Sequence, residues 1–241
     1  MGYEIRSLKY IPKQFARDQD TLKITFDHVI YRHMAEKAGD DPFFFVQVGA
    51  FDGKDCDPLY KFIGRYSWSG ILLEPQPEAF GKLMALHGGN SRMTLVNAAI
   101  AKTESKVDFY ILEGDDLPSW SKGMASFDIG NILKHRELIP SIDQHIRKTQ
   151  VDCVTFASLF SRYSITRLDL LQVDTEGFDA EVIYMFPFDV LKPAIIHFES
   201  KHLGKTKLEG VLDYLIPMGY RVAYDGAEDM LVVLGAAISA S

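Results

Sequence analysis

Two kinds of hydrophobic pattern alternate along the chain. In the first kind, nearly every residue of a short run is apolar, as in parallel strands covered on both faces. In the second kind, apolar residues recur every three or four positions, as on one face of a helix. The strand-like runs are residues 43–48, 69–75, 93–101, 168–174 and 193–199, and the helix-like stretches are 21–38, 57–66, 77–89, 155–163, 178–186 and 207–219. This order predicts strands connected by helices.

The end of the chain breaks the alternation. Two strand-like runs flank the sequence DGAED at residues 225–229, which indicates an antiparallel hairpin. Strands joined by helices form a parallel sheet with helices on both faces. We therefore expect an α/β fold, with a doubly wound, mostly parallel seven-stranded sheet and a C-terminal antiparallel hairpin strand.

The middle of the chain is less regular. Residues 105–114 alternate like a strand, whereas residues 115–148 show only one helical patch, near NILKHRELI. No repeat, low-complexity stretch or linker divides the sequence. We expect one domain over residues 41–241, preceded by a helical extension over residues 1–40.

The composition limits the classes of molecule that the protein is expected to bind. The formal net charge of -7 disfavours nucleic acid, because a protein bound to phosphates normally presents a basic face. Cys56 and Cys153 form neither a disulfide framework nor a zinc motif, which suits a cytoplasmic location. No stretch reaches the ~18 apolar residues of a membrane span. A small-molecule or glycan partner fits these properties best.

The turn after the first strand, Gly49-Ala50-Phe51-Asp52-Gly53, is the strongest candidate for chemistry. Open α/β sheets bind ligands beyond the carboxyl ends of their strands. The dinucleotide fingerprint G-x-G-x-x-G needs a glycine where Phe51 stands, and Asp52 would repel a pyrophosphate. An NAD-dependent oxidoreductase is therefore the weaker interpretation.

An acidic turn suits a cationic ligand better. S-adenosylmethionine carries a sulfonium, an ammonium and a ribose but no phosphate. Glu74, at the end of the second strand, is placed to accept hydrogen bonds from ribose hydroxyls, as acids at this distance also do in dinucleotide binders. The alternative is structural, with glycines at positive φ and Asp52 as a helix cap.

Four segments in this order, FFVQVGAFDG, ILLEPQPEAFGKL, LVNAAIA and LLQVDTEGFDAEVI, resemble the FkbM-type methyltransferases. The likeness runs from about Phe43 to about Glu199, and VDTEGFDAEVI is its most specific part. The family commonly has valine or isoleucine at Thr175 and glutamate at Asp179, which are mild departures. The resemblance implies a Rossmann-like class I methyltransferase domain over 41–241 that uses S-adenosyl-L-methionine for O-methylation.

The resemblance also implies which residues surround the cofactor. Gly49, Asp52 and Gly53 would lie around its methionine part, and Glu74 would hold its ribose. Asn97 and Ala98, after the third strand, would lie along the adenine. Ser126 would contact cofactor or substrate, although a loop serine bonded to its own backbone is an equal alternative.

Acidic and histidine side chains at the ends of the fourth and fifth strands are the catalytic candidates. Asp174 is the best candidate to hold the cofactor's amino group or orient the acceptor hydroxyl, followed by Glu176. Asp179 fits the first turn of a helix instead. Glu199 ends the fifth strand and His202 follows it, with His202 the candidate base, whereas His197 fits a buried core position.

A metal site is not predicted, because no dedicated ligand spacing is present. A divalent ion between Asp174 and Glu199 is the alternative, since such an ion lowers the pKa of a bound hydroxyl. We expect the acceptor pocket to come from residues 115–148 and the N-terminal helix, with Trp120 and Phe127 stacking on a sugar. Basic residues there would suit a glycosyl or phosphorylated acceptor.

The expected function is thus methyl transfer to a hydroxyl of a sugar, glycan or secondary metabolite. A non-catalytic cofactor-binding or scaffold module on the same fold is the alternative from a different class. Binding of the cofactor without methyl transfer to any hydroxyl acceptor would favour that alternative.

Overall fold

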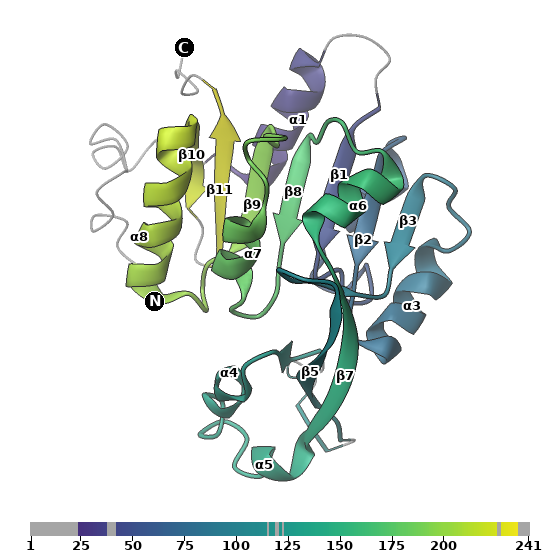
Figure 1. Cartoon of the computed structure of the whole chain (residues 1–241), viewed down its shortest axis with the longest axis vertical. Coiled ribbons are helices and arrows are strands. Elements are labelled where there is room, and N and C mark those ends of the chain that lie inside the picture. The colour runs from purple at the N-terminus through teal and green to yellow at the C-terminus, as the bar shows by residue number, and fades with distance from the viewer. Residues whose placement is uncertain are drawn as a thin grey trace.

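The computed structural model describes residues 24–37, 42–114, 116–118, 121, 123–225 and 228–235. Its centre is a seven-stranded sheet with the order β10-β11-β9-β8-β1-β2-β3 (Figure 1). The strands are β1 (Phe44–Val48), β2 (Ser69–Leu73), β3 (Met93–Val96), β8 (Leu170–Val173), β9 (Ile195–Glu199), β10 (Tyr220–Asp225) and β11 (Asp229–Leu234). Neighbouring strands in the run β9-β8-β1-β2-β3 pair in parallel, while β11 is antiparallel to both β9 and β10. The predicted fold class is confirmed.

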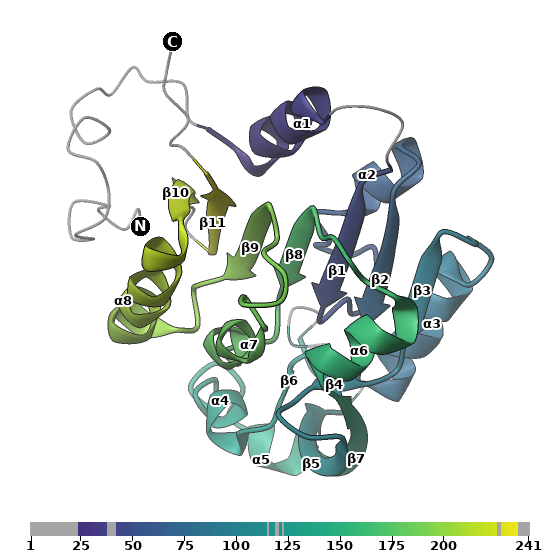
Figure 2. The same cartoon turned by 45° about the horizontal axis from the view of Figure 1, so that its top comes forward.

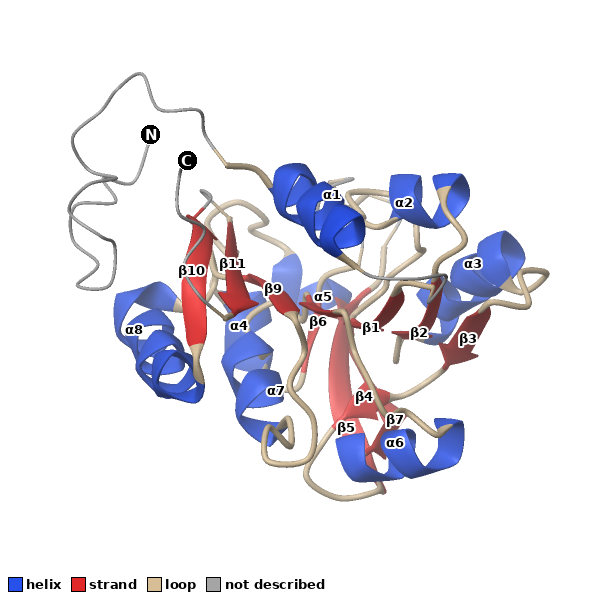
Figure 3. Ribbon diagram, turned by 90° about the horizontal axis from the view of Figure 1, so that it is seen from above, coloured by secondary structure: helices blue, strands red, loops and turns tan. Residues whose placement is uncertain are grey.

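The two faces of this sheet pack into separate hydrophobic cores. Along β1, Val46 and Val48 enter one core and Phe45 enters the other, because successive side chains of a strand point to opposite faces. The first face is covered by α6 (Phe156–Tyr163), α7 (Asp179–Met185) and α8 (Gly204–Leu215), the second by α1 (Phe26–Glu36), α2 (Tyr60–Arg65) and α3 (Pro77–His87) (Figure 3). Burial on both faces explains the continuous apolar runs.

A second, four-stranded sheet extends beyond the carboxyl ends of the main strands (Figure 1). Its order is β4-β7-β5-β6, with β4 (Ala99–Ile100), β5 (Ser105–Leu112), β6 (Ala125–Ser126) and β7 (Ile146–Val154). Two short helices, α4 (Ile129–Leu133) and α5 (Ile142–His145), accompany it, as Figure 2 shows. This sheet therefore stands next to the edge where open α/β folds bind ligands.

Two sequence predictions are wrong in this region. Residues 93–101 do not form one strand: β3 ends at Val96, and the chain continues as β4 in the second sheet. Both strands are buried, so the apolar run does not mark the change of sheet. Residues 115–148 are not irregular throughout, because they include β6 and the start of β7.

The N-terminal helix begins later than its hydrophobic pattern suggests. Thr25 precedes α1 and forms a capping box with His28, each side chain hydrogen-bonding to the other's backbone N–H. Phe26, Val29 and Ile30 bury one face of the helix against the sheet. Residues 1–23, most of the expected extension, lie outside the described residues. In the part of the chain that is described, no helix has the length and apolar character needed to cross a membrane.

Candidate active site

The turns after β1 and β8 meet at the carboxyl edge of the main sheet. The chain order reverses between these two strands, since β2 and β3 continue on one side and β9 on the other. Open α/β sheets bind ligands at such a reversal. A Cβ atom on Gly49 would lie 1.7 Å from the main-chain oxygen of Asp174. The lack of a side chain at Gly49 therefore lets the two turns approach.

The turn formed by residues 49–53 has a left-handed backbone at three positions. The φ angles are 82° at Gly49, 47° at Phe51 and 74° at Gly53. A positive φ at a bulky residue such as Phe51 is uncommon and costs on the order of 1–3 kcal/mol. Such strain is concentrated at functional sites, which supports the turn as a candidate site on grounds independent of its sequence motif.

Glu74 follows β2 and fixes this turn. Its carboxylate accepts hydrogen bonds from the N–H of Phe51 and the N–H of Gln76, both at 2.8 Å. The side chain is only 3% exposed. Burial raises the pKa of Glu74 to about 7, and the two N–H donors only partly oppose this. Among the described residues no cationic side chain pairs with it, so it is a buried acid without a counter-charge.

Asp52 and Asn97 also hydrogen-bond to nearby backbone. One carboxylate oxygen of Asp52 accepts from the N–H groups of Lys54 and Asp55, both at 2.9 Å. This is the arrangement of an Asx turn, and α2 starts only at Tyr60, so Asp52 is not its cap. The amide of Asn97 donates to the main-chain oxygen of Glu74 at 2.7 Å. The contacts of Gly49, Asp52, Gly53, Glu74, Asn97 and Ala98 with a cofactor stay predictions.

The turn after β8 is held by a buried carboxylate. Asp179 accepts hydrogen bonds from the N–H groups of Thr175 and Gly177, both at 3.1 Å. Burial, and then repulsion from Glu199, raises the pKa of Asp179 to about 7. The predicted place of Asp179 in the first turn of a helix is confirmed, since α7 begins there. It shapes the turn that carries Glu176, which itself has a left-handed φ of 52°.

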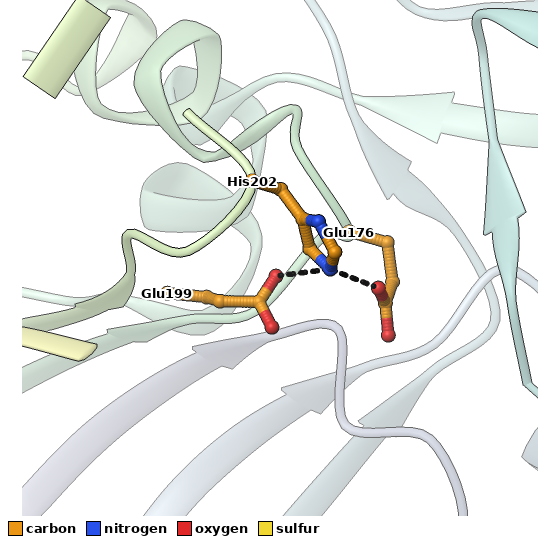
Figure 4. A group of neighbouring side chains, drawn as sticks. All are labelled: Glu176, Glu199 and His202. Atoms are coloured by element: carbon orange, nitrogen blue, oxygen red, sulfur yellow. Dashed lines mark ion pairs between the residues drawn. The ribbon is translucent and has the colours of Figure 1, made fainter. Parts of the chain in front are cut away.

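Three of the predicted catalytic residues converge at this rim. The Nε2 atom of His202 lies 3.1 Å from a carboxylate oxygen of Glu176 and 3.8 Å from one of Glu199. Figure 4 shows the imidazole between the two carboxylates. The hydrogen bond to Glu176 raises the pKa of His202. Burial favours a higher pKa for Glu176, but His202 outweighs it, so this pKa is lowered.

Asp174 adds a further acid to the same rim. The residue as a whole is exposed, but neighbouring protein atoms crowd its carboxyl group and reduce the hydration of that group. This desolvation, and then repulsion from Glu199, Asp179 and Glu176, raises the pKa of Asp174 well above its usual value. Lys201, whose Nζ lies 2.7 Å from Glu199, is the nearest basic partner of the group. The rim therefore carries excess negative charge.

A small pocket that is open to solvent adjoins His202 and Glu176. Its other lining residues are Met124, Ala125, Ser126, Asn131, Ile132, Lys134 and His135. The hydroxyl of Ser126 accepts a hydrogen bond from the amide of Asn131 at 3.1 Å, and Lys134 donates to that amide's oxygen at 2.7 Å. The second sheet and α4 thus form one polar wall, opposite the acidic rim.

Some residues singled out in the sequence lie elsewhere. His197 is buried in the core, where its Nδ1 lies 2.7 Å from the amide oxygen of Gln172. Burial lowers the pKa of His197 to about 3. The half-buried ring of Phe127 packs on Phe109 and Phe178, both at 5.0 Å between centroids, so two aromatic neighbours already occupy part of its surface. Trp120 lies outside the described residues.

The expected basic acceptor surface is smaller than the sequence suggests. Arg136 pairs with Asp143 and Lys148 with Asp108 on exposed surfaces. Among the described basic residues of the segment 115–148, only Lys134 and His135 line the pocket, and no residue of α1 does. Lys201 and Asn131 were not among the candidates that the sequence offered. Lys201 could have been noticed, since it stands between Glu199 and His202, whereas Asn131 depends on tertiary contacts that no local pattern reports.

Comparisons with known proteins identify the family of this chain. The family model described as Methyltransferase FkbM domain matches residues 47–222. The structure titled methyltransferase FkbM from Methylobacillus flagellatus KT superimposes with a TM-score of 0.50 at 12% identity, covering 88% of this chain and 48% of that one. This chain therefore spans about half of that relative. No curated protein matches the sequence.

An rRNA methylase from Streptococcus thermophilus also has a similar structure, with a TM-score of 0.46 and 11% identity over 90% of this chain and 100% of that one. Identities this low concern the fold alone. The family model, by contrast, matches more than half of the chain and includes the turns after β1, β2 and β8. The protein therefore belongs to the FkbM family of S-adenosylmethionine-dependent methyltransferases.

Proposed function

We propose that this protein moves a methyl group from S-adenosylmethionine to a hydroxyl of a sugar, glycan or secondary metabolite. The observation that carries the proposal is the contact between His202 and Glu176, at 3.1 Å, beside a polar pocket. An acid and an imidazole next to an open pocket are suited to hold a hydroxyl group and take part in its deprotonation.

The residues around the glycine turn fit the cofactor's charge and polarity. Glu74 is a buried acid without a cationic partner among the described residues, and its oxygens retain lone pairs for ribose hydroxyls. Gly49, Asp52 and Gly53 would surround the methionine part, with Asn97 and Ala98 along the adenine. The excess negative charge near Asp174 suits the ammonium group.

The cofactor supplies a methyl group on a sulfonium, which is a good leaving group. The protein's task is then to position the acceptor oxygen, which contributes much of the rate. Ser126 and Asn131 form the wall that can orient polar groups of an acceptor. The acidic rim faces that wall, and assistance with proton removal typically adds about 10²–10⁴-fold.

Titration calorimetry tests the cofactor first, with S-adenosylmethionine, S-adenosylhomocysteine and NAD in separate runs. We expect binding of the first two and none of NAD. Glu74→Ala should weaken S-adenosylmethionine binding by about 1.5–3 kcal/mol, the value of a charge-assisted hydrogen bond. Glu78→Ala is the matched control, because Glu78 lies nearby on α3 with a highly exposed side chain. NAD binding alone, or no binding, would contradict the proposal.

Methyl transfer is tested with a panel of hydroxylated acceptors and cofactor carrying a labelled methyl group. His202→Ala should lower turnover and leave the affinity for S-adenosylmethionine unchanged. Full activity in this variant would remove His202 from the site. Cofactor binding without transfer to any acceptor would instead support a non-catalytic module.

A further inference from the structure

We propose that Glu176, Glu199 and His202 form a binding site for one divalent first-row transition-metal ion. Glu176 lies in the turn after β8, Glu199 is the last residue of β9, and His202 follows β9 (Figure 4). One ligand atom from each, two carboxylate oxygens and an imidazole nitrogen, all lie within 4.8 Å of one another. A histidine with two carboxylates is a common kind of ligand set for such ions.

Two of the three ligand-atom separations are close to those expected around a single ion. Ligand atoms about 2.1 Å from one ion lie roughly 3–3.5 Å apart in octahedral or tetrahedral geometry. The Nε2 atom of His202 is 3.1 Å from Glu176 and 3.8 Å from Glu199. A small rotation of the Glu199 side chain would bring the last separation into this range.

An unsatisfied buried atom points to the same place. Among the residues that the structure describes, the Oε2 atom of Glu199 has no hydrogen-bond partner, although the side chain is only 4% exposed. It is also the oxygen that faces His202 in Figure 4. Leaving such an acceptor unpaired is destabilising, and more so when it is charged. A cation bound between Glu199 and His202 would supply the missing partner.

The surrounding charge favours a dication. Four carboxyl groups interact at this rim, those of Asp174, Glu176, Asp179 and Glu199. Lys201 contacts the other oxygen of Glu199 at 2.7 Å, and His202 contacts Glu176 at 3.1 Å. These two contacts pair only two of the four acids, so a dication would lie beside acidic groups that they do not neutralise.

The mixed nitrogen and oxygen ligands indicate the class of ion. Mg²⁺ and Ca²⁺ prefer oxygen ligands alone, whereas Mn²⁺, Fe²⁺ and Zn²⁺ also accept imidazole. Both Glu176 and His202 line the open pocket, so further coordination positions would face it. An ion there would lower the pKa of an acceptor hydroxyl that it binds. That last role rests on the proposed function, whereas the ion site itself does not.

Mn²⁺ is the probe for the test, because its free aqueous ion gives an electron paramagnetic resonance signal that disappears on binding. The full chain, treated with a chelator and dialysed, is titrated with MnCl₂ alone. We expect one site in the wild-type protein. His202→Ala and Glu199→Gln should each weaken binding by at least roughly 10-fold, since loss of even an outer partner of a metal ligand costs about 10–100-fold.

The control is Glu228→Gln, because Glu228 also lies beside Lys201, at 3.8 Å, but outside the three ligands. It should bind Mn²⁺ as the wild type does. Lys201→Met should tighten binding several-fold, because it removes a positive charge next to the ion. Absence of a Mn²⁺ site in the wild type, or equal affinity in His202→Ala, would overturn the proposal.

Calorimetry with S-adenosylmethionine on the same chelator-treated samples separates the two proposals. Mn²⁺ binding without cofactor binding would support the ion site and contradict the proposed function. Cofactor binding and methyl transfer without any Mn²⁺ site would do the reverse.

Discussion

Two buried carboxylates at opposite edges of the main sheet, Asp169 and Glu74, have pKa values shifted in opposite directions. At the amino edge, Asp169 is surrounded by donors: His33 at 2.9 Å, the Nζ of Lys37 at 2.6 Å and the N–H of Phe44 at 2.8 Å. Burial alone would raise the pKa of Asp169, but these donors outweigh it and lower the pKa to about 2. At the carboxyl edge, Glu74 has only backbone donors, and its pKa is raised to about 7.

This difference distinguishes a carboxylate that stabilises the fold from one that is available to a ligand. A buried acid with cationic partners stabilises the folded state at neutral pH, whereas one without them opposes folding there. Perturbed groups of the second kind are concentrated at functional sites. The amino edge thus holds the sheet together, while the carboxyl edge retains charge that a cationic ligand would neutralise.

The largest effect is expected from breaking the carboxyl edge at Gly49. Gly49→Ala would place a Cβ 1.7 Å from the Asp174 oxygen, on a backbone with φ 82°. A left-handed φ at alanine costs about 1–2 kcal/mol, and overpacking adds about 1–3 kcal/mol. We expect a loss of about 2–5 kcal/mol in unfolding free energy, measured by urea denaturation.

Gly64→Ala is the matched control for Gly49→Ala. Gly64 lies within α2, and a Cβ there would meet nothing within 4 Å. The control should gain about 0.5–1 kcal/mol from helix propensity. Equal stability of the two variants would show that the turns do not need to approach as closely as we describe.

A smaller effect is expected at the amino edge from Asp169→Asn. The folded-state pKa of Asp169, about 2, lies below the usual 3.8. Its stabilisation is therefore complete above that usual value and disappears as the pH falls through 2. We expect Asp169→Asn to lose about 2 kcal/mol at pH 7 by urea denaturation, and clearly less at pH 3. A loss that is independent of pH would contradict the ion-pair explanation.

The smallest effect, with the opposite pH dependence, is expected for Glu74→Gln. Because the pKa of Glu74 is about 7 in the folded state, against 4.5 for an ordinary glutamate, the wild type loses stability as the pH rises from 4.5 to 7. The glutamine variant lacks this loss. The stability difference between wild type and variant should therefore shift by about 1–2 kcal/mol in favour of the variant between pH 5 and pH 6.5. A shift in the other direction would show that Glu74 has a cationic partner.

The sequence predicts the main sheet well because its strands are buried on both faces. Every strand of that sheet coincides with an apolar or alternating run, and the hairpin sequence DGAED marks β10 and β11. The second sheet was missed, since β4 continues the apolar run of β3 and β6 is only two residues long. Hydrophobicity reports burial, not which sheet a strand joins.

The candidate site shows a similar limit. Strand-end position was enough to predict that Glu176, Glu199 and His202 share one rim, since carboxyl ends of parallel strands meet at one edge. It could not predict that His202 lies between the two acids, or that one oxygen of Glu199 has no hydrogen-bond partner among the described residues. It also could not predict that Phe127 packs on two other aromatic rings. Those distinctions depend on side-chain contacts between segments far apart in sequence.

The second sheet begins and ends at neighbouring points of the fold, because β4 and β7 pair in parallel, with Ala99 opposite Cys153. The segment between them therefore leaves the main sheet and returns to it at adjacent positions. An excursion of this kind can change in length or composition without altering the strands that carry the glycine turn. The proposed acceptor wall lies in this segment, so chimaeras exchanged at β4 and β7 would test whether acceptor choice moves with residues 99–154.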